Sequence, residues 1–167
     1  ICESLNLNQW LREDRSKDVL IPIPLGLGNV EEVKKLYALA PNNPGAFTFS
    51  DTGKKSPVVG EMKITTLDSF AERQGWFQSK PSIGMLKLDV EMFERYVIEG
   101  ADRLIRSNLI ETISMELKPT TLKADKSKIL SILYSAGYEM YLHGTWQGPK
   151  NEVKEYSRWE DLLADID

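Results

Sequence analysis

Three acidic residues stand close together just after an apolar segment. The segment Leu86-Lys87-Leu88 leads directly into Asp89, Glu91 and Glu94. In open α/β sheets, ligands bind beyond the carboxyl ends of the strands. Carboxylates at such a place can accept a proton from a hydroxyl, bind a divalent cation or hold an amine of a cofactor. The alternative is structural: Asp89 caps the following helix, and the two glutamates are first-turn acids favoured by the helix dipole.

A second apolar segment also ends near an acid. Ile110–Leu117 is typical of a strand, and Glu116 lies at its end. An unpaired carboxylate would be costly to bury there, so we expect Glu116 to pair with a lysine or to face a cleft. Lys87 is expected to form a structural ion pair. The acids considered as its partner are Glu61, Glu111 and Glu116.

His143 and a pair of glycines are further candidates for chemistry. His143 is the only histidine in the chain. Histidine is a common general base, although a loop histidine is more often simply solvated. Gly26-Leu27-Gly28 is similar to a fragment of a phosphate-binding loop, but the longer glycine-rich fingerprint is absent.

The composition argues against several classes of protein. The chain has 167 residues, an ordinary length for one domain, with 25 acidic and 21 basic residues. No basic run is present, which argues against nucleic acid and anionic membranes as partners. One histidine argues against a Ser-His-Asp hydrolase and a multi-histidine zinc site. Cys2 is the only cysteine, which suits a reducing compartment, with the cytoplasm as the default expectation. No apolar run reaches the length of a membrane span.

Strands and helices are expected to alternate in the second half of the chain. The strands predicted there are Ile83–Asp89, Ile110–Leu117 and Tyr138–Leu142. Apolar residues recur between them at three- and four-residue intervals, which predicts helices. Such alternation is typical of crossover units that build a parallel sheet with helices on its faces. The acidic ends at Asp89 and Glu116 would then lie side by side at one edge of that sheet.

Two helices are predicted in this half. The first runs from Phe93 to Leu104 and is interrupted by Gly100, which marks a cap or a close backbone approach. The second has Asp125 as its N-cap and Gly137 as its C-terminal glycine.

The first half is expected to begin with a helix and a strand. Residues 3–14 are amphipathic, with Leu7, Trp10 and Leu11 on one face. Val19–Leu25 is expected to be a strand, and its two prolines place it near a sheet edge.

A hairpin and a helix start are expected next. Two strand-like runs around a Pro/Asn/Gly turn predict a β-hairpin insertion at about residues 35–50. Thr65–Asp68 matches a helix-start capping pattern, and that helix is expected to stop near Gly75. We expect residues 1–167 to form a single, partial domain.

Several short motifs in this chain occur in the order of a known family. They are Thr65-Thr-Leu-Asp68, Leu86-Lys-Leu-Asp-Val-Glu91, Phe93-Glu94 and Glu99-Gly-Ala101. A strand that ends on Glu116 and a later Gly137-Tyr138 follow in the same order. Together these pieces resemble the signature of the FkbM family of S-adenosylmethionine-dependent methyltransferases.

The resemblance implies a fold and an activity. The fold would be α/β, a Rossmann-like class I methyltransferase sheet that is mostly parallel and has helices on both faces. The cofactor would be S-adenosylmethionine, and the methyl group would go to a hydroxyl oxygen of a small molecule or sugar. Asp89 would be the general base or a ligand of the substrate hydroxyl, and Glu91 and Glu116 would orient the substrate or a cation.

The resemblance also implies contacts for the two ligands. Gly26 and Leu27 would lie near the cofactor, together with Asp89. Glu94 and His143 are the candidates for substrate contact. We assign no metal ligands and no oligomeric state.

The chain departs from the family pattern in two respects. The family's glycine after the second acid is Met92 here, which crowds the turn beside the site. The first strand, with its glycine-rich cofactor loop, is not in this chain, which is expected to start at the helix after the second strand. A non-catalytic module of the same fold is therefore an alternative. A metal-dependent hydrolase that uses Asp89, Glu91 and Glu116 is a third.

Overall fold

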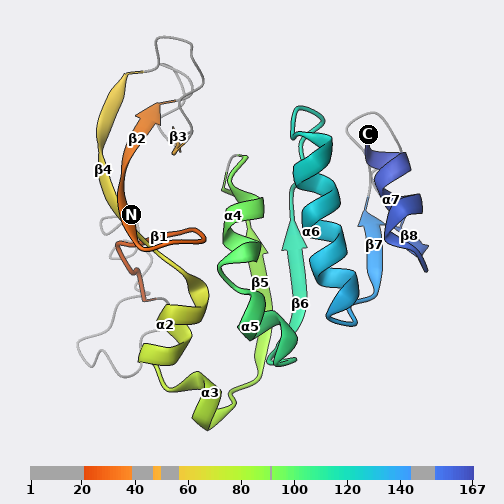
Figure 1. The fold of residues 1–167 in the computed structure, drawn as a ribbon, viewed down its shortest axis with the longest axis horizontal. Coiled ribbons are helices and arrows are strands. Elements are labelled where there is room, and N and C mark those ends of the chain that lie inside the picture. The colour runs from red at the N-terminus through yellow and green to blue at the C-terminus, as the bar shows by residue number, and fades with distance from the viewer. Residues whose placement is uncertain (1–20, 39–46, 50–56, 91, 144–152) are drawn as a thin grey trace, which may run out of the picture.

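The described part of the chain has a mixed α/β architecture. The computed structural model describes residues 21–38, 47–49, 57–90, 92–143 and 153–167. Its strands form one four-stranded sheet and two separate strand pairs (Figure 1). The predicted α/β class is confirmed in this broad form, but the described strands do not make up one continuous Rossmann-like sheet. The predicted helix at residues 3–14 lies outside the described residues.

The four-stranded sheet is mixed. Its strands, in spatial order, are β1 (Gly26–Leu27), β4 (Val58–Thr65), β2 (Glu32–Ala38) and β3 (Phe47–Thr48). Strand β1 is parallel to β4, whereas β2 is antiparallel to both β3 and β4. The pairing of Tyr37 with Thr48 agrees with the hairpin expected around residues 35–50.

The strand predicted over Val19–Leu25 is displaced along the chain. Residues 21–25 form no strand, and the ladder begins only at Gly26. Pro22 and Pro24 carry no N–H group, so these two positions cannot donate to a strand ladder. The N–H of Leu25 donates locally, to the carbonyl of Ile23 at 2.8 Å.

A parallel strand pair carries the acidic ends. It consists of β5 (Ile83–Leu88) and β6 (Ile110–Met115), in which Leu86 lies opposite Ile113. The crossover between them contains α4 (Glu94–Glu99) and α5 (Asp102–Arg106). Both helices lie in front of the strand pair in Figure 1. The parallel pairing and the helical crossover confirm the expectation for this half.

The crossover contains two helices rather than the one predicted. The backbone of Gly100 lies so close to the first strand that a Cβ atom there would stand 1.9 Å from the carbonyl oxygen of Gly28. Helix α4 ends at this contact, and α5 begins two residues later. The expectation that Gly100 marks a close backbone approach is therefore confirmed.

Helix α2 (Leu67–Arg73) begins as its capping pattern predicts. The hydroxyl of Thr66 accepts a hydrogen bond from the backbone N–H of Ser69 at 2.9 Å. Asp68 acts elsewhere, because its carboxylate accepts the backbone N–H groups of Arg103 and Leu104 at 2.9 and 2.8 Å. These bonds satisfy free donors at the start of α5. The short helix α3 (Trp76–Ser79) follows after Gly75.

The C-terminal part adds α6 (Lys123–Ser135), β7 (Met140–His143), β8 (Val153–Tyr156) and α7 (Trp159–Ile166). The predicted N-cap at Asp125 is wrong, because α6 begins two residues earlier and Asp125 lies in its first turn. Its carboxylate instead accepts a hydrogen bond from Arg95, which joins α6 to α4. Gly137 follows the helix with a φ of 89°, as a C-terminal glycine should.

One face of the β5–β6 pair is covered by helices. The five fully buried apolar side chains of greatest volume all belong to α4, α5 and α6: Val97, Ile98, Leu104, Ile105 and Ile129. They share a core with Leu88 of β5 and Ile110 of β6. On the opposite face, Met85 is 62% exposed. The described residues therefore cover one face of the pair, not the two that were expected.

Candidate active site

Asp89 and Glu116 lie together at the ends of neighbouring strands. Leu88 pairs with Met115, so the next residue of each strand is an acid. The backbone N–H of Glu116 donates to the carbonyl of Leu88 at 3.4 Å, which continues the ladder beyond the strand ends. The expectation that the two acids lie side by side is confirmed.

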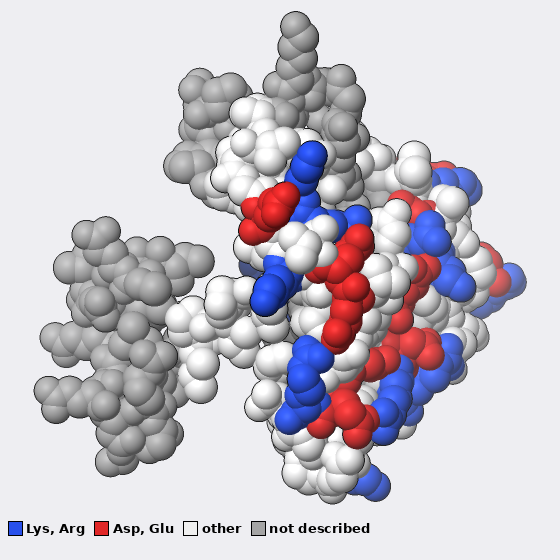
Figure 2. All heavy atoms as spheres, turned by 60° about the vertical axis from the view of Figure 1, so that its left-hand side comes forward, with Lys and Arg blue, Asp and Glu red and all other residues white. Residues whose placement is uncertain are grey.

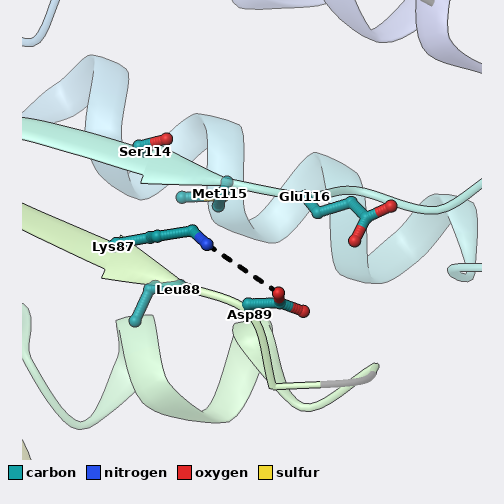
Figure 3. Close-up of a pocket in the computed structure, with 6 residues that line it drawn as sticks. All are labelled: Lys87, Leu88, Asp89, Ser114, Met115 and Glu116. Carbon is teal, nitrogen blue, oxygen red and sulfur yellow. Dashed lines mark ion pairs between the residues drawn. The ribbon is translucent and has the colours of Figure 1, made fainter. Parts of the chain in front are cut away.

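The two acids line a hollow of about 190 Å³ (Figure 3). Its other lining residues are Lys87, Leu88, Ser114 and Met115. Binding pockets for whole cofactors and drug-sized ligands are roughly 300 to 1,000 Å³. The hollow therefore has room for one functional group of a ligand and its surroundings.

Lys87 is the cation of this hollow. Its Nζ lies 4.0 Å from Oδ2 of Asp89, and the two side chains are 71% and 52% exposed. The predicted partners of Lys87 were Glu61, Glu111 and Glu116, and the ion pair with Asp89 corrects that prediction. Residues two apart on a strand point to the same side, which brings these two together. An exposed pair at this distance is weak, so either group can be drawn to a ligand.

The turn between β5 and α4 has an unusual backbone. Met92 has a φ of 70°, in the left-handed region, and its side chain is 42% exposed. Glycine adopts this conformation freely, whereas it costs other residues roughly 1 kcal/mol or more. The turn next to the acidic strand end therefore has a strained backbone at Met92, whereas the expected crowding by its side chain stays a prediction.

The glycines of the first strand serve packing. A Cβ atom on Gly26 would lie 2.5 Å from Ile64, and one on Gly28 would lie 2.8 Å from the same side chain. Leu27 between them is half-buried against the core. The space beside both glycines is thus filled by the chain itself. The cofactor contacts of Gly26 and Leu27 stay a prediction.

A comparison with protein-family models identifies the group of proteins to which these features belong. The model of the methyltransferase FkbM domain matches residues 5–140. The chain belongs to the FkbM methyltransferase domain family. Searches of curated proteins and of solved structures found no match. The family resemblance expected from the short motifs is confirmed.

Two expected substrate contacts lie away from the hollow. Glu94 is only 4% exposed in the first turn of α4, a place where the helix dipole favours an acid. His143 is exposed at the end of β7, where it pairs with Val153. Neither residue lines the hollow at Asp89, so their contacts with substrate stay predictions. Glu91, the second of the three acids after the apolar segment, lies outside the described residues.

Ser114 is a lining residue that the sequence interpretation missed. It stands opposite Lys87 in the parallel pair and two residues before Glu116. The signal that could have found it is the two-residue period of a strand, which puts every second side chain on the same face.

Metal and membrane sites were also considered. Among the described residues, no group of three or more His, Cys, Asp or Glu side chains is placed to hold a metal ion. Within that same part of the chain, no helix combines the length and apolar character needed to cross a membrane. On the face that Figure 2 shows, basic and acidic side chains are interspersed rather than gathered into one basic patch.

Proposed function

We propose that this FkbM domain takes part in methyl transfer from S-adenosylmethionine to a hydroxyl oxygen of a small molecule or sugar. The observation that carries the proposal is the pair of carboxylates, Asp89 and Glu116, at adjacent strand ends around one hollow. Membership of a methyltransferase family supports the reaction class. A hydroxyl of a small molecule or sugar as acceptor is what the resemblance to the FkbM family implies.

Asp89 is the proposed base. Its side chain is half exposed, so a hydroxyl group can approach it from solvent. The carboxylate would accept the hydroxyl proton as the acceptor oxygen forms its bond to carbon. S-adenosylmethionine, when bound, would supply the methyl group. The main task of the protein is then to hold the acceptor oxygen in line with that group.

Glu116 and Ser114 are proposed to orient the acceptor. Both line the hollow from β6, opposite the β5 residues Lys87 and Asp89. A carboxylate and a hydroxyl can accept hydrogen bonds from neighbouring hydroxyls of a polyol. Glu91 is proposed to contribute to the same task.

The test is methyl transfer by Asp89→Asn. Purified protein is incubated with S-adenosylmethionine that carries a tritium-labelled methyl group and with a panel of sugars and hydroxylated small molecules. We expect Asp89→Asn to lose about 100-fold or more in kcat, because a positioned base contributes at least that much. The matched control is Glu111→Gln, which changes an exposed acid at the other end of the same strand pair. Equal turnover of wild type and Asp89→Asn would remove Asp89 from the reaction.

A non-catalytic role is the second candidate. It is supported by the side chain of Ile64, which occupies the space beside Gly26 and Gly28. Calorimetry with S-adenosylmethionine separates the two candidates. Micromolar binding would contradict the non-catalytic role, and the absence of both binding and methyl transfer would contradict the enzymatic one.

A further inference from the structure

A second hollow lies at the other end of β6 from the candidate active site. Its volume is about 410 Å³, within the range of roughly 300 to 1,000 Å³ that is usual for ligand pockets. Tyr138, one of its lining residues, donates from its hydroxyl to the carbonyl of Ile110 at 2.7 Å. Ile110 is the first residue of β6, whereas Glu116 follows the last. The two hollows are therefore separated by the length of this strand.

The lining of the second hollow combines aromatic rings with carboxylates. Among the described residues that line it, two are acidic and none is basic. Part of the lining lies beyond residue 140, where the FkbM match ends, so the family match does not extend over the whole hollow. We call it the tyrosine hollow, and its side chains are those of Tyr134, Tyr138, Tyr156, Glu139, Glu155 and Ser157.

The tyrosines present ring surface to this hollow. The hydroxyl of Tyr138 is already hydrogen-bonded, and that of Tyr156 donates to the carboxylate of Asp165. Tyr156 is only 7% exposed, whereas Tyr134 is 46% exposed and can be reached from solvent. The face of an aromatic ring attracts a cation that lies within about 6 Å of its centre. Tyr134 is therefore the ring best placed to meet a bound cation.

The two carboxylates act at the same place on the β7–β8 pair. Tyr141 stands opposite Glu155 in the antiparallel ladder. Its hydroxyl donates to Oε2 of Glu139 at 2.9 Å. This hydrogen bond raises the pKa of Tyr141, and the negative charges of Glu139 and Glu155 raise it further. The hollow thus has two negative charges close to one another.

The basic residues next to these acids are engaged elsewhere. Lys154 donates to the carboxylate of Asp165, and its Nζ lies 4.7 Å from the centre of the Tyr156 ring. Arg158 lies 3.7 Å from Glu160. Within the described part of the chain, neither carboxylate of the tyrosine hollow forms an ion pair. Their charge is therefore available to a ligand.

We propose that the tyrosine hollow binds the ammonium group of an organic cation. Glu139 and Glu155 supply the opposite charge, and the ring of Tyr134 supplies a face for the cation. A metal ion fits less well, because no group of three or more His, Cys, Asp or Glu side chains comes together among the described residues. A neutral sugar could stack on a tyrosine, but it would leave the charge of both carboxylates unused.

A titration with choline tests this proposal. The full chain is labelled with ¹⁵N, and the amide signals of Gly137 and Ser157, which both line the hollow, are followed by NMR. The matched probe is 3,3-dimethyl-1-butanol, which has the shape of choline without its charge. We expect saturable shifts with choline, and at least about fivefold weaker binding of the alcohol. One carboxylate about 4 Å from a cation contributes that factor even in water.

Variants of exposed residues assign the binding to the hollow. Glu155→Gln should weaken choline binding at least about fivefold, whereas Glu61→Gln removes the same charge from strand β4 and should leave it unchanged. Tyr134→Leu should weaken it about two- to fivefold, and Tyr134→Phe, which keeps the ring, should not. The same spectra show whether each variant is folded.

Four results would overturn the proposal. One is the absence of saturable shifts at Gly137 and Ser157 when choline is raised to about 50 mM, which would fill a millimolar site. Another is equal affinity for choline and the neutral alcohol. The third is an affinity of Glu155→Gln that equals that of the wild type. The last is tighter binding of methyl glucoside than of choline, which would assign the hollow to a neutral sugar.

Discussion

The two ends of helix α4 are built in opposite ways. At the N-terminal end, Met92 is exposed and its backbone is left-handed. At the C-terminal end, Gly100 has an ordinary φ of −78° but no room at all, since a Cβ would stand 1.9 Å from Gly28. One position calls for glycine because of its conformation, and the other because of its packing. Of these two positions, only the closely packed one carries glycine in this chain.

The two ends of α4 differ because one packs against the rest of the fold and the other lies beside the candidate site. The C-terminal end of α4 joins two parts of the fold, because the backbone N–H of Asp68 donates to the carbonyl of Gly100 at 2.9 Å. The N-terminal end opens beside Asp89 and the candidate site. Strained backbone tends to occur at functional sites, where the surrounding structure enforces it. The strain at Met92 is thus found at the end where ligands would bind.

The largest effect is expected at the packed end. Gly100→Ala should destabilise the protein by about 3 kcal/mol, because the new methyl group must push back the Gly28 backbone. That movement would also break the 3.0 Å bond from Gly28 N–H to the carbonyl of Thr65. Chemical denaturation measures the change. The control is Gly60→Ala, since a Cβ there would meet nothing within 4 Å. Similar losses in both variants would refute the packing argument.

A smaller loss is expected when the tie between α2 and α5 is cut. Asp68→Ala should destabilise the protein by about 1 to 2 kcal/mol, because two backbone N–H groups at the start of α5 lose their acceptor. Asp102→Ala is the matched control, since Asp102 is also a first-turn acid of α5 but forms only an exposed pair with Arg106. Thermal unfolding of both variants gives the comparison. An Asp102 variant that is as unstable as the Asp68 variant would argue against a capping role.

The smallest effect, of opposite sign, is expected at the strained end. Met92→Gly should stabilise the protein by about 0.5 to 1 kcal/mol, because glycine accepts the left-handed backbone at little steric cost. Asn108→Gly, at a φ of 54°, should gain less, since asparagine tolerates this conformation better than methionine. Denaturation curves rank the two variants. A loss of stability in Met92→Gly would show that the methionine side chain contributes more than its backbone costs.

Local signals made part of this fold predictable. The cap of α2 by the hydroxyl of Thr66 was predictable because a capping motif is contained in a few consecutive residues. The meeting of Asp89 with Glu116 followed from strand–helix alternation, since a helical crossover brings parallel strands into register. Gly137 was predictable as the C-terminal glycine of α6 because the signal is local, a glycine directly after the last residues of the apolar helix pattern.

Features that depend on distant partners were not predictable. The first strand has only two residues and exists because β4, almost 40 residues later, pairs with it. The predicted single helix over Phe93–Leu104 is broken by a contact with Gly28, which no local pattern reveals. Lys87 pairs with Asp89, two residues along the chain, rather than with an acid on a neighbouring strand. The packing of Gly26 likewise depends on a distant partner, the side chain of Ile64.

The contact between the first strand and the end of α4 also sets an order of events during synthesis. Asn29, which follows that strand, donates to Glu99 at 3.0 Å across a separation of 70 residues. A ribosome adds about 5 to 20 residues per second, so the first strand is made roughly 4 to 14 seconds before Glu99. During that interval β1 can already pair with β4, but the end of α4 is still missing from its other side. The Gly26–Asn29 segment therefore gains its two partners at different times during synthesis.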